Sequence, residues 1–381
     1  MSYLDKLLDG VEVKWKPLGE VADYEQPTKY LVNSTVYNDA YKTPVLTAGK
    51  TFILGYTDET DGIFEASKNP VVIFDDFTTA NKWVDFDFKA KSSAMKIITS
   101  KDENSTLIKY IYYWLNTLPS GLIEGDHKRQ WISNYCNKQI PIPCPENPEK
   151  SLAIQKEIVR ILDTFTELTT ELTTELTARK KQYNYYRDQL LSFEDKEVEW
   201  KPLEILAENL DSMRKPVTSG SREAGEIPYY GASGIVDYVK DYIFDGDFLL
   251  VSEDGANLIA RNTPIAFSIS GKSWVNNHAH VLKFPTYSDR RFVEYYLNSI
   301  DLTPYISGAA QPKLNQKNLN SIKIPNPSPE EKIRIVSILD KFDTITASIS
   351  EGLPKEIELR QKQYEYYRDM LLTFPNDNLK A

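Results

Sequence analysis

The amino-acid sequence contains the same frame twice, and this repeat constrains the fold more than any local motif. Three segments return along the chain: Glu12–Leu18 as Glu197–Leu203, Ile158–Asp163 as Ile335–Asp340, and Arg179–Phe193 as Arg360–Phe374. The stretches between these segments are almost completely different in the two halves. A long-period repeat indicates one structural unit built twice. We therefore expect a common scaffold with two-fold pseudo-symmetry that carries two unlike inserts.

Length and charge narrow the class of protein. A chain of 381 residues is long enough for two or more domains. The net charge of −10 argues against indiscriminate coating of nucleic acid, although a local basic strip would still permit DNA binding. The sequence has no apolar run of membrane-spanning length and no secretory leader, so we expect a cytoplasmic protein that does not engage a membrane. Cys136 and Cys144 are then expected to be free thiols.

Each half contains two kinds of sequence pattern, one typical of strands and turns and one typical of long helices, and together they predict an α+β fold. Residues 14–147 and 197–327 carry short β-branched and aromatic runs broken by Gly, Pro, Asn and Asp, with single helices predicted near 106–115 and 290–297. Long helical segments follow each of them. We expect a first mixed α/β domain over 1–147, a helical spacer over 148–194, a second mixed domain over 195–328, and a second helical spacer with its tail over 329–381.

The helical segments have clear starts and an apolar stripe. Asn147 precedes Pro148, and Ser328–Glu331 is a capping box with Pro at the first helical position. Apolar residues at spacings of three and four predict that the stripe from Ile154 to Leu176 faces the one from Ile335 to Ile349 in an antiparallel coiled coil. The second helix should break at Gly352–Pro354. The predicted interface consists of Ile158, Leu162, Phe165, Leu168, Leu172, Leu176, Ile335, Leu339, Phe342, Ile345 and Ile349.

A four-residue repeat lies inside the first helical spacer. The segment Thr166–Thr177 repeats Thr-Glu-Leu-Thr, which is either a solvated helix face with Leu turned inward or a device that sets helix length. One further unit would lengthen the helix by about 6 Å and rotate its far end by about 40°. If the helix separates two DNA readers, the repeat would set the distance between their half-sites.

Polar residues in both inserts suit DNA contact. In the first insert they are Lys128, Arg129, Gln130, Trp131 and Ser133, and in the second they are Gln311, Lys313, Asn315 and Lys317. Weaker candidates are Lys82, Lys91, Arg261 and Lys272. Arg can pair with guanine, Gln with adenine, and Lys with phosphate. Ordinary solvated surface turns are the open alternative for every one of these residues.

Every segment that resembles a catalytic motif lacks at least one residue that the motif requires. The Asn-Pro pairs at 69–70, 147–148 and 326–327 lack the second Pro that an amino-methyltransferase requires. The segment Ala266–Ser273 departs from a phosphate-binding loop, and His278 with His280 lacks further ligands at metal-binding spacing. Asp75 or Asp76 with Asp87 and Lys89 imitates a nuclease site only loosely. We therefore expect no catalytic residue, no bound metal and no cofactor in this chain.

The order of segments resembles a known family. Variable modules end in Gln139–Pro143 and Ser321–Pro325, the second after Ser307–Asn315, and each is followed by a helical repeat. This organisation resembles the specificity subunit of type I restriction–modification enzymes. The Thr-Glu-Leu repeat, the segment Lys181–Asp188 and Glu351–Pro354 look most like the type IC group. The first module departs from the family pattern, because Asp126–Ser133 stands where the second has Gly-Ala-Ala-Gln-Pro-Lys-Leu-Asn.

The resemblance implies a function and a set of partners. Each variable module would be a target-recognition domain reading one half of a bipartite double-stranded DNA site. The helices would space the modules and dock two modification subunits, which carry S-adenosylmethionine, and restriction and translocase subunits would join them. The competing interpretation is a stand-alone nuclease or methyltransferase with a coiled-coil hinge. A pure coiled-coil scaffold would not explain two large unlike inserts.

Overall fold

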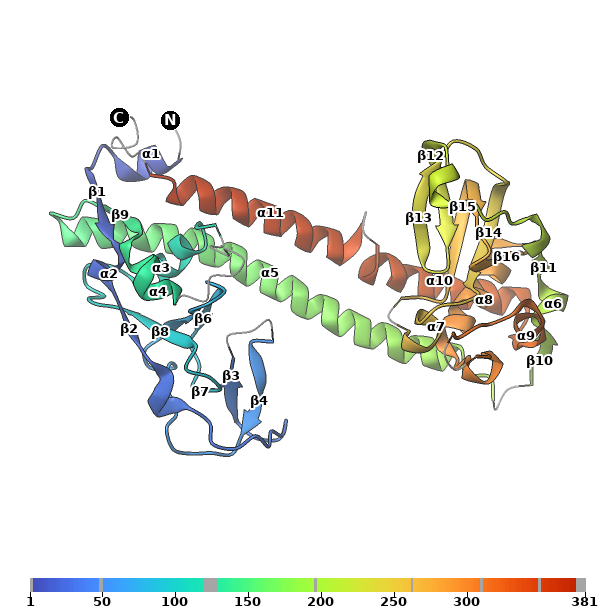
Figure 1. Ribbon diagram of the computed structural model, residues 1–381, viewed down its shortest axis with the longest axis horizontal. Helices are drawn as coiled ribbons and strands as arrows, with labels where there is room; N and C mark the ends of the chain where they lie inside the picture. Colours follow the sequence, from blue (N-terminus) through green and yellow to red (C-terminus); the bar gives the residue numbers. More distant parts are fainter. Residues whose placement is uncertain are drawn as a thin grey trace. The chain divides into compact units, whose positions relative to one another are not determined.

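The computed structural model describes residues 3–47, 51–119, 129–194, 197–261, 263–308, 311–348 and 351–374. The chain forms two compact units (Figure 1): unit 1 contains residues 1–172 and 357–381, and unit 2 contains residues 173–356. The long helices α5 (Pro148–Leu190) and α11 (Gly352–Leu372) each contribute residues to both units. Among the described residues, no helix has both the length and the apolar character needed to cross a bilayer.

Unit 1 is built on a four-stranded sheet in the order β2-β8-β5-β6, a three-stranded sheet in the order β4-β3-β7, and the pair β1-β9. Its strands are β1 (Val13–Pro17), β2 (Ala22–Glu25), β3 (Thr43–Leu46), β4 (Ile53–Thr57), β5 (Val71–Asp75), β6 (Asn81–Val84), β7 (Lys89–Ala90), β8 (Met95–Ser100) and β9 (Gln139–Pro143). Its short helices are α1 (Tyr3–Leu8), α2 (Leu18–Val21), η1 (Pro27–Tyr30), α3 (Ile108–Leu115), α4 (Gln130–Ser133) and η2 (Tyr135–Asn137).

Unit 2 is built on a six-stranded sheet in the order β11-β16-β14-β15-β12-β13 and the pair β10-β17. Its strands are β10 (Glu199–Pro202), β11 (Glu208–Asn209), β12 (Ala224–Gly231), β13 (Gly234–Val239), β14 (Phe244–Ser252), β15 (Ala266–Val275), β16 (Ala279–Lys283) and β17 (Lys323–Asn326). Its helices are α6 (Leu203–Leu206), η3 (Asp211–Met213), η4 (Ser219–Ser221), α7 (Asn257–Ala260), α8 (Tyr287–Ser299), η5 (Thr303–Tyr305), α9 (Gln316–Ser321) and α10 (Pro329–Thr346).

The repeated sequence folds in the same way in both units. The copies of Glu-Val-x-Trp-Lys-Pro-Leu form β1 with α2 and β10 with α6. Trp15 of β1 pairs with Pro141 of β9, and Trp200 of β10 pairs with Pro325 of β17. The predicted α+β class, the duplication of the frame and the long helices are therefore confirmed.

The central strand of each unit has two buried faces. In β5, Val72 and Phe74 pack into the cluster that includes α3, and the alternate residues Val71 and Ile73 pack into a second cluster. In β14, residues 249 and 251 face the cluster that includes α8, and residues 248 and 250 face the opposite cluster. Because side chains alternate along a strand, β5 and β14 play equivalent roles in the two units.

The helical spacers begin where the sequence predicts, and the break in the second one lies just before the predicted Gly352–Pro354. Helix α5 begins at Pro148, and α10 is capped by the Ser328 side chain, which accepts a hydrogen bond from the Glu331 N–H. Helix α10 ends at Thr346 and α11 begins at Gly352, whose φ of +77° is one that glycine adopts without strain. The sequence signals for helix ends therefore located three of the boundaries well.

The predicted pairing of the two apolar stripes is wrong in its register. Ile158 and Leu162 pack in unit 1 with the end of α11, and Phe165 stacks on Tyr367 with ring centroids 5.1 Å apart. Ile335 and Leu339 pack in unit 2 with Leu191 and Phe193, where Phe342 stacks on Tyr186. The start of each repeated helix therefore faces the end of the other copy, as an antiparallel arrangement requires. Leu168, Leu172, Leu176 and Ile345 are only half-buried or exposed, and Ile349 lies outside the described residues.

Candidate nucleic-acid interface

The predicted basic segment of the first insert is partly surface and partly core. Arg129 is exposed immediately before α4, and its carbonyl oxygen accepts a hydrogen bond from the Ser133 hydroxyl at 2.5 Å. Ser133 is also exposed. Lys128 lies outside the described residues. Arg129 and Ser133 therefore stay available for contact with DNA.

Gln130 and Trp131 are buried, so the prediction that they contact DNA is wrong for this conformation. Trp131 is 2% exposed and packs edge-on against Phe74 at 5.2 Å between ring centroids. The Gln130 side chain is buried at the start of the same helix, where it accepts a hydrogen bond from Asn134. The sequence placed two cations beside an amide and a ring, but the ring and the amide anchor the segment to the core.

A buried carboxylate holds this segment in place. Asp76 follows β5 directly and is 1% exposed. Its Oδ1 accepts a hydrogen bond from the Trp131 backbone N–H at 2.8 Å, and its carbonyl oxygen accepts one from the Gln130 N–H, also at 2.8 Å. The other carboxylate oxygen lies 3.2 Å from Lys96 Nζ, and Lys96 is fully buried on β8. Asp76 and Lys96 thus join the core to the surface segment that presents Arg129.

The two weaker candidates of the first insert are both exposed. Lys82 lies on β6 with no ion-pair partner among the described residues. Lys91 follows β7, and its ammonium lies 5.8 Å from the centroid of the Tyr37 ring. Neither lysine is committed to a carboxylate that the structure describes. Both can therefore contribute positive charge to a DNA phosphate.

In the second insert, the predicted polar residues surround a tight turn. The backbones of Ser307 and Lys313 exchange two hydrogen bonds, at 2.9 and 2.8 Å. Gly308 has a φ of +81°, and a Cβ there would lie 2.5 Å from the Gln311 carbonyl oxygen, so the turn requires glycine. Gln311 and Lys317 are exposed. The side chain of Asn315 caps α9 by accepting a hydrogen bond from the Asn318 N–H at 2.9 Å, which is a structural role.

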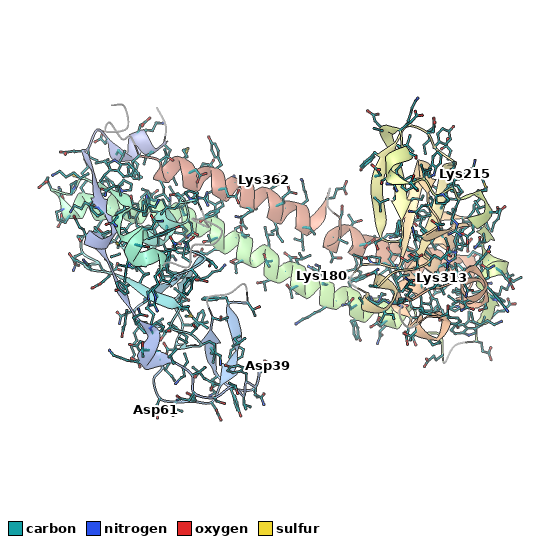
Figure 2. The ribbon with its side chains drawn as sticks, viewed as in Figure 1. Asp39, Asp61, Lys180, Lys215, Lys313 and Lys362 are labelled. Atoms are coloured by element: carbon teal, nitrogen blue, oxygen red, sulfur yellow. The ribbon has the colours of Figure 1, made fainter. Side chains whose placement is uncertain are left out.

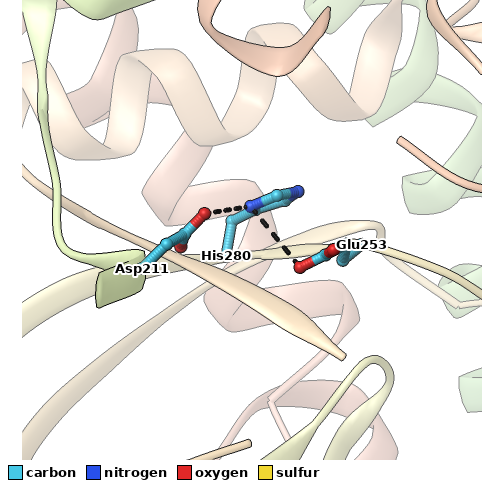
Figure 3. A group of neighbouring side chains, drawn as sticks. All are labelled: Asp211, Glu253 and His280. Atoms are coloured by element: carbon cyan, nitrogen blue, oxygen red, sulfur yellow. Dashed lines mark hydrogen bonds and ion pairs between the residues drawn. The ribbon is translucent and has the colours of Figure 1, made fainter. Parts of the chain in front are cut away.

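Lys313 belongs to a charged network at the base of this turn. Its Nζ lies 3.1 Å from Glu253 Oε1, while Arg214 donates to Glu253 Oε2 at 2.6 Å. His280 is fully buried, with Nδ1 2.6 Å from Asp211 Oδ2 and Nε2 2.7 Å from the Leu314 carbonyl oxygen. Figure 3 shows how Asp211 and Glu253 converge on the His280 ring. Figure 2 places Lys313 and the exposed Lys215 on unit 2.

Asp211, Glu253 and His280 together have the donor set of a metal site, but the charges of the two carboxylates are already compensated. Asp211, Glu253 and His280 each offer one ligand atom, and these atoms lie within 4.8 Å of one another. Arg214 and Lys313 provide two positive charges beside the two carboxylates. Burial by itself would raise the pKa of Asp211, yet the hydrogen bond from His280 and its charge outweigh burial and lower that pKa. This arrangement is an ion-pair network that supports the turn.

Arg261 has a structural role, so its prediction as a DNA contact is wrong for this conformation. Its guanidinium donates hydrogen bonds to the carbonyl oxygens of Ile300, at 2.5 Å, and Asn298, at 3.4 Å. These carbonyls end helix α8, where unpaired carbonyl groups favour a cation. Burial lowers the pKa of Arg261. By contrast, Lys272 is exposed on β15, with its ammonium 4.6 Å from the centroid of the Tyr242 ring.

Sequence reasoning missed the residues that hold these surface segments. Asp76, Lys96, Arg214 and Glu253 were not singled out as parts of a binding surface. The available signal was an acidic residue directly after an apolar strand, as in Val-Val-Ile-Phe-Asp-Asp and Phe-Leu-Leu-Val-Ser-Glu. An acid in that position leaves a buried strand and needs a partner. The exposed Lys215 was also missed and has no ion-pair partner among the described residues.

Comparisons with known proteins point in one direction. The family described as "Type I restriction modification DNA specificity domain" matches residues 10–180 and 196–359. The EcoR124I/EcoR124II specificity subunit of Escherichia coli is 55% identical over 405 residues, covering 98% of each chain. The Escherichia coli EcoprrI specificity subunit is 34% identical over 92% of each chain. The solved type I restriction–modification S subunit from M. genitalium superimposes with a TM-score of 0.67 at 17% identity, covering 99% of this chain and 100% of that one.

Proposed function

The chain belongs to the DNA specificity subunits of type I restriction–modification systems, and from that membership we propose that each of its units reads one half of a bipartite DNA target. The chain is a non-catalytic recognition subunit, so the competing interpretation as a stand-alone nuclease or methyltransferase is set aside. The observation that carries the proposal is the duplicated frame, in which the same strand pairs and helices hold two unlike inserts. Unlike inserts on a common frame suit two different half-sites.

The exposed polar residues of the inserts are the proposed contacts. In unit 1 they are Arg129, Ser133, Lys82 and Lys91. In unit 2 they are Gln311, Lys313, Lys317, Lys272 and Lys215. Arg129 and Gln311 have the donor geometry for bases, whereas the lysines suit phosphates. The net charge of −10 makes such local positive groups necessary for binding a polyanion.

Two modification subunits are the proposed partners on the repeated helices. Tyr185 and Tyr366 occupy equivalent positions of the repeated Gln-Tyr-x-Tyr-Tyr-Arg-Asp sequence, and they are 60% and 66% exposed. Exposed aromatic side chains are frequent anchors of protein interfaces. Because the site occurs twice, we propose that one modification subunit, carrying S-adenosylmethionine, docks at each copy. Restriction and translocase subunits would join this core, and all of them would act in the cytoplasm, where the target DNA lies.

The bipartite proposal is tested by selection from random DNA. The chain is mixed with its modification subunits, S-adenosylmethionine and a library of random duplexes, and the methylated molecules are sequenced. We expect two short defined half-sites separated by a fixed gap of undefined bases. A single continuous target would overturn the proposal.

The docking proposal is tested by the composition of the complex. Tyr185→Ala and Tyr366→Ala should each reduce the assembly from two modification subunits to one, measured by analytical ultracentrifugation. Ile333→Ala is the matched control, because Ile333 is 57% exposed but its repeat counterpart is Lys156. Unchanged stoichiometry in both tyrosine variants would place the docking site elsewhere.

A further inference from the structure

Units 1 and 2 each place a buried basic side chain near an acid at the same position of the fold. In unit 1, Phe74 of β5 pairs with Lys96 of β8, and the acid Asp76 follows two residues after Phe74. In unit 2, Val251 of β14 pairs with His280 of β16, and the acid Glu253 follows two residues after Val251. Lys96 and His280 are both fully buried. The inserts differ in sequence, but the register makes these residues equivalent.

Each pair meets the surface segment that we propose contacts DNA. Asp76 accepts hydrogen bonds from the backbone N–H groups of Gln130 and Trp131, directly after Arg129. In unit 2, the Glu253 carbonyl oxygen accepts a hydrogen bond from the Leu314 N–H at 2.8 Å. His280 Nε2 lies 2.7 Å from the Leu314 carbonyl oxygen, directly after Lys313. Both peptide groups that flank Leu314 are therefore fixed.

Stability alone is a weak explanation for these pairs. Bringing two charges out of water is costly, and apolar residues of similar volume often serve a core as well or better. Lys96 Nζ and Asp76 Oδ2 face each other at 3.2 Å, yet neither atom has a hydrogen-bond partner among the described residues. A buried, incompletely bonded carboxylate that reaches a surface segment is better explained by its hold on that segment.

We propose that Asp76 in unit 1 and His280 in unit 2 are positioning residues for DNA readout. This inference rests on the proposed function, because it assumes that the segments 129–133 and 311–317 contact DNA. The Asp76 side chain fixes the Gln130–Trp131 peptide group, and the His280 side chain fixes the Leu314–Asn315 peptide group. Each of these groups lies one residue beyond the peptide bond that follows the candidate contact, Arg129 or Lys313, and so restricts where the contacting group can lie. The buried partner, Lys96 for Asp76 and Asp211 with Glu253 for His280, keeps the positioning side chain in one orientation.

A matched pair of double variants separates positioning from stability in unit 1. Both variants carry Lys96→Met, which removes the buried cation. In one it is combined with Asp76→Asn, which keeps an oxygen acceptor for the Trp131 N–H, and in the other with Asp76→Ala, which removes that acceptor. We expect the Ala variant to lose discrimination at one or more bases of the first half-site by about tenfold, and the Asn variant to keep most of it. Discrimination in the second half-site should stay unchanged in both.

Unit 2 allows the reciprocal experiment. His280→Gln keeps an N–H that can donate to the Leu314 carbonyl oxygen, whereas His280→Leu removes it. The Leu variant should relax the second half-site alone. Val71→Ala is the stability control, because it creates a cavity in the core cluster on the opposite face of β5, which contains no residue of the segment 129–133. It should lower the melting temperature and leave base discrimination intact.

The readout is selection from a random DNA library by the complete complex with its modification subunits. If the wild-type complex selects no bipartite target, the proposed function fails. If it does, and the Ala and Leu variants keep full discrimination, only the positioning role fails. Equal loss in both half-sites, or equal loss in Val71→Ala, would reduce the pairs to ordinary core residues and would also overturn the inference.

Discussion

The Tyr113 hydroxyl donates a hydrogen bond to Asp163 Oδ1 at 2.5 Å and so joins α3 of the first insert to the repeated helix α5. In unit 2, the Tyr295 hydroxyl donates to Asp340 Oδ1 at 2.7 Å. Asp163 and Asp340 are equivalent positions of the sequence repeat. Lys109 and Arg291, each four residues before the tyrosine, pair with the same carboxylates at 2.9 Å. Two unlike inserts therefore contact the common frame through the same arrangement, in which a tyrosine and a basic side chain both bind one aspartate. We call this arrangement the joint.

Removing one tyrosine hydroxyl should destabilise its own unit. Tyr113→Phe leaves a carboxylate without one of its donors, and we expect a loss of about 1–3 kcal/mol in the free energy of unfolding, measured by denaturant titration. Burial raises the pKa of Tyr113, so its hydroxyl stays protonated and donates across the neutral range. Tyr185→Phe, at an exposed ring, is the control and should cost almost nothing. Equal losses in the two variants would contradict the joint.

Arg129→Ala tests direct readout in the first half-site. If the guanidinium reads a base, specificity at that base should relax by about 1–3 kcal/mol. If it holds a phosphate instead, binding should weaken uniformly, and the slope of log K against log salt should fall by about one. Competition binding at several salt concentrations distinguishes the two. Arg261→Lys should preserve base specificity, because Arg261 is engaged by the end of α8. An unchanged Arg129→Ala complex would place this residue outside the interface.

Inserting one Thr-Thr-Glu-Leu unit into the segment 166–177 tests the spacer. The segment lies within the continuous helix α5, away from both candidate contact segments in the sequence. The insertion lengthens the helix by about 6 Å, against 3.4 Å for one base pair, so we expect a preferred gap wider by one or two base pairs. Both half-sites should stay the same. The substitution Thr170→Ala, at an exposed position of the same helix, is the control and should leave the gap unchanged. Altered half-site bases or an unmoved gap would show that α5 does not set the distance between the half-sites.

Acid should loosen unit 2 through its charged network. Burial favours a raised pKa in Asp211 and Glu253, but His280 and Arg214 outweigh it, so both pKa values lie below their ordinary range. A carboxyl with a depressed pKa stabilises the fold above its unfolded value, near pH 4, and that stability is lost as the pH falls through the folded value. The protection factors of the β14 and β16 amides, which correct exchange rates for the intrinsic effect of pH, should therefore fall below about pH 4. Asp211→Asn should start from lower stability and show a shallower pH dependence. An identical pH dependence would exclude Asp211 as the source.

Some features of this chain could be predicted from its sequence, and others could not. The duplicated frame, the helix starts at Pro148 and Pro329, and a break close to Gly352 could be predicted, because repeats, caps and prolines act through neighbours in the chain. The exposure of Arg129, Gln311 and Lys317 also agreed with the polar patterns that singled them out. By contrast, the burial of Trp131 and the hydrogen bonds of Arg261 to the end of α8 could not be predicted. Trp and Arg occur both at binding surfaces and in structural roles, and the sequence does not distinguish the two.

The sequence by itself determined that one frame is built twice, since local signals and the repeat require nothing from distant parts of the chain. Only the tertiary structure decided which residues hold the candidate contacts. Strand register brings Lys96 to Asp76 and His280 to Glu253, and burial then forces each charge to find a partner. The tertiary structure also decided that the start of each repeated helix packs near the end of the other copy. Such partners are set by pairing between strands and helices distant in sequence, which no spacing along one segment encodes.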